Sequence, residues 1–71
     1  MRYRLLADEI EVWQGYMEPT QNKINKVYEA ASNDGWNGVS LDLYQDFKFI
    51  EEVKPDFVKA LTGKISPILT L

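Results

Sequence analysis

The stretch SNDGWNGVSLD, residues 32–42, places one of the two tryptophans of this chain close to two glycines. Its first four residues are a cluster that commonly ends a helix, since Asn33 or Gly35 can adopt the left-handed conformation of a C-terminal cap. A large apolar ring directly after such a cap is costly if it stays in water. Trp36 therefore either folds back to close the structure or is kept exposed for a partner.

The three residues Trp36, Asn37 and Gly38 are expected to form and close this turn. Asn-Gly favours a tight turn, because Gly38 can adopt backbone angles that other residues avoid. The sequence predicts a turn over residues 34–39 that joins two helical halves, with the indole of Trp36 lying across their open end.

Upstream of the turn, apolar residues recur at spacings of three and four, which places them on one face of a helix. We therefore predict a first helical half over residues 4–33. Gly15 and Pro19 interrupt this segment, and proline removes a helical hydrogen bond, so we expect a kink there or two helices in line. An alternative is that EIEVW, residues 9–13, forms an edge strand, because its apolar and acidic residues alternate.

Downstream of the turn, Ser40 has the character of a helix N-cap and Asp42 suits the positive end of a helix. A second helical half over residues 40–62 is predicted, bent before Pro55 because the residue that precedes a proline disfavours helix. The apolar tail, residues 63–71, either packs back as an extended segment or docks on another chain.

The predicted fold is thus all-α, a kinked antiparallel helical hairpin or a small helical bundle, formed by a single domain over residues 1–71. Ten apolar residues are expected to form the core or a dimer seam: Tyr3, Leu6, Ile10, Trp13, Ile24, Val27, Phe47, Ile50, Phe57 and Leu61.

Composition limits the function classes. With 45% hydrophobic residues and a net charge of −3, the chain is too apolar for a disordered segment. Its 71 residues make a small core and there is no cysteine to form a disulfide, so a homo-oligomer is expected. The eight Lys and Arg are scattered, so nucleic acid is not expected as a partner.

No apolar run approaches the ~20 residues of a membrane span. No classical signal peptide is recognised, so the expected location is the cytoplasm, or the exterior by a leaderless route.

Histidine is absent as well as cysteine. The usual general base, the usual nucleophile pairs and the commonest zinc ligands are therefore missing. The loop that begins at Asn33 fails the calcium-loop pattern, which needs an oxygen ligand where Gly35 stands and an acid where Tyr44 stands. We expect no enzymatic activity, no metal and no cofactor.

Near the middle of the chain, Trp36, Asn37 and Gly38 form a Trp-x-Gly motif, and Tyr44 follows within VSLDLYQ. In these residues the chain resembles the WXG family of small proteins exported by type VII secretion systems. The resemblance implies a helical hairpin over about residues 4–62 that pairs with itself or a sister chain.

The expected function is a non-enzymatic protein–protein interaction module. A hairpin buries one face of each helix, so aromatic residues outside the stripes are candidates for a partner surface. These residues are Tyr16, Tyr44 and Phe49. A secretion-associated hairpin is one interpretation. The alternative is a small phage- or mobile-element-type regulator or inhibitor that binds and blocks a larger host protein.

Overall fold

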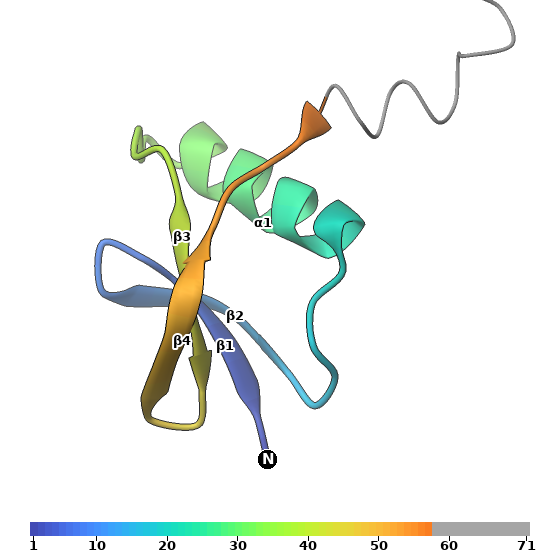
Figure 1. The fold of residues 1–71 in the computed structure, drawn as a ribbon. Helices are drawn as coiled ribbons and strands as arrows, with labels where there is room; N and C mark the ends of the chain where they lie inside the picture. The colour runs from blue at the N-terminus through green and yellow to red at the C-terminus, as the bar shows by residue number, and fades with distance from the viewer. Residues whose placement is uncertain (58–71) are drawn as a thin grey trace, which may run out of the picture.

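The computed structural model describes residues 1–57, which form four strands and one helix. The elements follow in the order β1 (Tyr3–Ala7), β2 (Ile10–Gly15), α1 (Gln21–Asn33), β3 (Leu41–Gln45) and β4 (Lys48–Val53). The strands form one antiparallel sheet in the order β2-β1-β3-β4. Helix α1 packs against one face of this sheet (Figure 1).

The expected all-α fold is therefore wrong, and the chain forms neither a helical hairpin nor a helical bundle. The first predicted helical half contains the β1–β2 hairpin, and only its last part, α1, is helical. The second predicted half begins with the β3–β4 hairpin, and Ser40 precedes a strand instead of capping a helix. The alternative for EIEVW is correct, because β2 is an edge strand.

Bulges in both edge strands explain why the sequence resembled a helix. Leu5 pairs with Trp13 and Leu6 pairs with Glu11, which leaves Val12 without a partner in β1. Ile50 of β4 likewise has no partner in β3. An extra residue shifts the alternation of a strand by one position, so Ile10 and Trp13 share a face at a helix-like spacing of three.

The hairpin turns also lack their usual sequence signal. Tight hairpin turns need positive φ angles, which usually means Asn-Gly or Asp-Gly. Here Asp8 and Glu9 have φ angles of 50° and 69°, and Asp46 has a φ of 53°. Because no glycine marks either turn, the sequence pattern did not reveal two hairpins.

The two hairpins have the same construction. Each has a two-residue turn followed by two residue pairs, one bulged residue and three further pairs. The central strands β1 and β3 are joined antiparallel, and the equivalent residues Leu5 and Leu43 pair with each other. The sheet therefore has an approximate two-fold axis at the Leu5–Leu43 pair, in the middle of the core.

The core lies between the central strands and α1. Leu5 and Leu41 are completely buried, and α1 contributes Ile24, Val27 and Ala31. Of the ten expected core residues, Tyr3, Trp13, Ile24 and Val27 do pack in or against this cluster. Leu6 is buried outside the cluster, and the others that the structure describes are exposed: Ile10, Phe47, Ile50 and Phe57. Leu61 and the tail of residues 63–71 lie outside the described residues.

Both ends of α1 are capped. The Thr20 hydroxyl accepts a hydrogen bond from the backbone N–H of Lys23 and serves as the N-cap. At the other end Gly35 has a φ of 100°, as its place in SNDG predicts. The N–H of Gly35 donates to the carbonyl of Ser32, and the N–H of Trp36 donates to the carbonyl of Ala31. These two bonds form a Schellman motif.

The buried Asn25 ties the segment after β4 to the helix. Its side-chain amide donates to the carbonyl of Asp56 at 3.2 Å and accepts from the N–H of Asp56 at 2.8 Å. Gln21 adds bonds to Asn25 and to the carbonyl of Lys54. The Asn25 amide thus bonds the backbone N–H and carbonyl of Asp56, in place of the strand pairing that stops at the end of β4.

The strained β1–β2 turn gives a stability prediction. A residue with a Cβ atom in the left-handed region costs about 1–2 kcal/mol. We expect Glu9→Gly to raise the free energy of unfolding by up to about 1 kcal/mol, partly offset by the greater freedom of glycine in the unfolded chain. Urea denaturation measures the change. Glu9→Ala removes the same carboxylate but keeps the strain, so the idea fails if glycine is no more stable than alanine at this position.

Candidate interaction surface

The face of the sheet opposite α1 carries no described element. Alternation along β1 and β3 places Arg4 and Tyr44 on this face, because Leu5 and Leu43 point to the helix. Arg4 pairs with Tyr44, and Tyr44 pairs with Phe49 on the next strand. With Phe47 from the β3–β4 turn, these residues form the Arg4 cluster: Arg4, Tyr44, Phe47 and Phe49.

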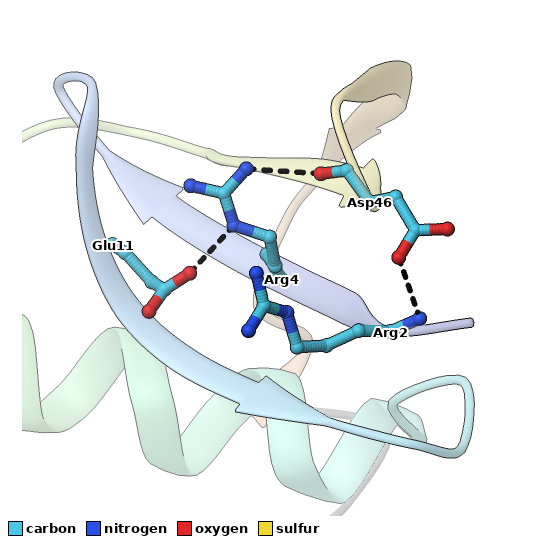
Figure 2. A network of polar contacts seen from close by, with 4 residues as sticks. All are labelled: Arg2, Arg4, Glu11 and Asp46. Carbon is cyan, nitrogen blue, oxygen red and sulfur yellow. Dashed lines mark hydrogen bonds and ion pairs between the residues drawn. The ribbon is translucent and has the colours of Figure 1, made fainter.

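Contacts on several sides hold the Arg4 guanidinium in place, as Figure 2 shows in part. Its Nε donates to Glu11 of β2 at 2.5 Å, and its Nη1 donates to the carbonyl of Asp46 at 2.9 Å. The guanidinium also lies 5.9 Å from the ring centre of Tyr44 and 5.7 Å from that of Phe47. These distances suit cation–π contacts. Arg4 therefore links β1 to β2, β3 and the β3–β4 turn.

Asp46 completes this network from the turn. Its backbone N–H donates to the carbonyl of Arg2. Its carboxylate accepts from the N–H of Arg2, as Figure 2 shows. The turn is thereby fixed to the start of β1.

The aromatic rings of the Arg4 cluster are available to a partner. Tyr44 and Phe49 meet edge to face, with ring centres 5.6 Å apart. Phe49 remains 48% exposed and Phe47 is 85% exposed. Exposed aromatic side chains beside an arginine held in place have the composition of a binding hot spot.

An acidic pair lies beside the Arg4 cluster on the same face. Asp42 of β3 pairs directly with Glu52 of β4. Like charges directly opposite each other across a sheet are destabilising. Among residues 1–57 neither carboxylate forms an ion pair. The face opposite α1 therefore has one end rich in aromatic residues and arginine, and another that is acidic.

Two of the three residues proposed from the sequence as a partner surface come together. Tyr44 and Phe49 lie in the Arg4 cluster, whereas Tyr16 is 83% exposed in the segment after β2 and makes no ring contact with them. Sequence reasoning missed Arg4 and assigned Phe47 to the core. Only the alternation of Arg4 with Tyr3 and Leu5 could have indicated that Arg4 faces away from the core.

Trp36 lies in the loop between α1 and β3, with no second helix described beyond it. Its half-buried ring packs against the core and meets Tyr28 edge to face, with ring centres 5.3 Å apart. The Tyr28 hydroxyl donates to the carbonyl of Gly38 at 2.7 Å. The ring of Trp36 therefore covers one end of the core between α1 and the sheet. The helical hairpin that the WXG resemblance implied is wrong.

Glycine is needed two residues after each tryptophan. A methyl group at Gly38 would overlap Cζ2 of Trp36, and one at Gly15 would come within 2.6 Å of Cζ2 of Trp13. Each indole thus lies on the backbone of the glycine two positions later. The Trp-x-Gly motif of Trp36 and Gly38 is explained by this close approach. Trp13 and Gly15 of β2 show the same contact between an indole and a glycine.

No family model, curated protein or solved structure matches this chain significantly. Within the part of the chain that the structure describes, no three acidic, histidine or cysteine residues are grouped to hold a metal ion. The helix of this same part is too short and too polar to span a membrane. The family resemblance itself stays a prediction.

A double-mutant cycle tests the packing of Trp36 on Gly38. We expect Trp36→Ala to cost about 3 kcal/mol, as for other buried aromatic rings. Gly38→Ala should be strongly destabilising in the natural chain, because the methyl group displaces the indole, but nearly neutral in the Trp36→Ala background. Additive effects of the two substitutions in thermal or urea unfolding would contradict this contact.

Trp36→Phe is the matched control for Trp36→Ala. The indole Nε1 is buried without a hydrogen-bond partner among the described residues, and an unpaired buried donor costs about 1–3 kcal/mol. Phenylalanine removes this donor and keeps an apolar ring beside Tyr28. The loss of stability should therefore be clearly smaller than for Trp36→Ala.

Proposed function

We propose that this protein is a non-enzymatic protein–protein interaction module that associates with a second copy of itself through the face of its sheet opposite α1. The Arg4 cluster is the observation that supports this proposal. It combines exposed aromatic rings with an arginine whose side chain is only 19% exposed and already held by Glu11. A partner therefore meets an arginine side chain that loses little conformational freedom on binding.

The different character of the two ends of the face favours a second copy as the partner. The face carries the Arg4 cluster at one end and the Asp42–Glu52 pair at the other. A two-fold arrangement of two such faces places the Arg4 cluster of each copy near the Asp42–Glu52 pair of the other.

The size of the face indicates a weak and reversible dimer. Four strands spaced by about 4.8 Å and five residues long give a footprint of about 19 Å by 17 Å. This is at the small end for specific protein interfaces. Buried aromatic side chains then contribute most of the affinity, and mixed charges fix the orientation.

Sedimentation equilibrium at concentrations up to about 1 mM tests the proposal. We expect a reversible monomer–dimer equilibrium for the natural chain. Phe47→Ser should weaken the dimer by at least about tenfold. Because Phe47 is 85% exposed, this substitution should leave the unfolding midpoint nearly unchanged.

Val39→Ser and Tyr16→Ser are the controls, since both residues are highly exposed but lie outside the Arg4 cluster. Neither should alter the dissociation constant. A chain that stays monomeric over the whole range would contradict self-association. A dimer that is weakened by Tyr16→Ser but not by Phe47→Ser would place the interface elsewhere.

A further inference from the structure

A groove lies on the helix side of the sheet, between the β1–β2 hairpin and the C-terminal end of α1. It encloses about 300 Å³. Its walls are apolar and its rim carries two carboxylates, from Asp8 and Asp34; the apolar lining residues are Ala7, Ile10, Val12, Ala31 and Trp36. Figure 1 shows the hairpin turn and this end of α1 on the same side of the molecule. The groove is thus separate from the Arg4 cluster.

One wall of the groove is an unpaired strand edge. β2 is the outermost strand on its side of the sheet, and no described strand pairs with its outer edge. The exposed side chains of Ile10 and Val12 stand on this strand. The bulge at Val12 disturbs the ladder on the β1 side. An edge strand beside a helix is the arrangement in which extended peptides add to a sheet.

The rim of the groove is negative, and no counterion for it is found among residues 1–57. Asp34 is the C-cap of α1, where the helix dipole is already negative, and the last turn of α1 has no basic residue. Among residues 1–57 neither Asp8 nor Asp34 forms an ion pair. A cation in the groove would be attracted by both carboxylates and by the helix end, and the ring of Trp36 would lie beside it.

We infer that the groove binds an extended peptide segment of a partner protein that pairs with the outer edge of β2 and inserts a lysine or arginine side chain. Main-chain hydrogen bonds to β2 provide affinity, as in other strand additions. The aliphatic stem of the side chain lies on Ile10, Val12 and Trp36, and its charged end lies between Asp8 and Asp34. At about 300 Å³ the groove is at the lower limit of ligand sites, which suits one long side chain.

Four synthetic pentapeptides test this inference. They share a valine and threonine framework of high strand propensity, and carry lysine, arginine, norleucine or glutamate at the centre. Titration into the full ¹⁵N-labelled chain, followed by amide and indole chemical shifts, gives the dissociation constants and the binding site. We expect saturable shifts at residues 10–13 and at the indole of Trp36. The lysine and arginine peptides should bind at least about tenfold more tightly than the glutamate peptide.

Substitution of an acidic residue at the rim measures how much its charge contributes to peptide binding. Asp34→Asn should weaken the lysine peptide several-fold and leave the norleucine peptide unchanged. Glu29→Gln is the matched control, because it removes one exposed carboxylate from the same helix outside the groove. It should leave both affinities unchanged. Because Asp34 is exposed, the amide spectrum of the variant should remain that of the folded chain.

Three results would overturn the inference. One is the absence of saturable shifts at the groove with all four peptides at about 10 mM. Another is equal affinity for the lysine and glutamate peptides. The third is n-butylamine binding as tightly as the lysine peptide, since the site would then bind a small cation without strand addition.

Discussion

At Gly35 the chain leaves α1 with a φ of 100°, and two backbone hydrogen bonds fix this turn against the last residues of the helix. The turn carries Trp36 back onto Ala31 and Tyr28, so that its ring lies over the end of the core. The indole then rests on Gly38, whose carbonyl is held by Tyr28. From there the chain enters β3, a central strand of the sheet. One left-handed residue thus determines where the helix ends, what covers the core and where the second hairpin begins.

The same turn separates the two surfaces that we propose for binding. Because α1 lies on one side of the sheet, the opposite side is left to Arg4 and the aromatic rings around it. On the helix side, α1 ends beside the β1–β2 hairpin and leaves the groove lined by Trp36 and Asp34. A self-associating face and a peptide groove on opposite sides would let one small domain join two copies of a partner.

The sequence predicted those features that depend on local backbone chemistry. The Gly35 cap, the loop after it and the helical character of the segment before it all follow from glycine, capping and periodicity. The hairpins were missed because their turns use Asp8, Glu9 and Asp46 at positive φ instead of glycine. The bulge at Val12 then gave Ile10 and Trp13 a helix-like spacing of three within a strand.

The candidate binding surface was only partly predictable from the sequence, because some of its contacts depend on the strand register. Tyr44 and Phe49 could be proposed from their aromatic character alone. The role of Arg4 depends on Glu11, Tyr44 and Asp46, which are distant in the sequence and meet it only through the strand register. Once the elements were assigned as helices, the face on which Arg4 stands could not be identified.

Replacement of Gly35 by the two mirror-image alanines tests the central role of this turn most directly. An added L-methyl group meets no atom within 4 Å, so Gly35→Ala measures backbone conformation without a clash. In synthetic chains, we expect L-alanine to lower the free energy of unfolding by about 1 kcal/mol, and D-alanine, which prefers positive φ, to raise it by about 0.4–1 kcal/mol. A chain with L-alanine that is as stable as the chain with D-alanine would contradict a left-handed turn at Gly35 and the position of Trp36 that depends on it.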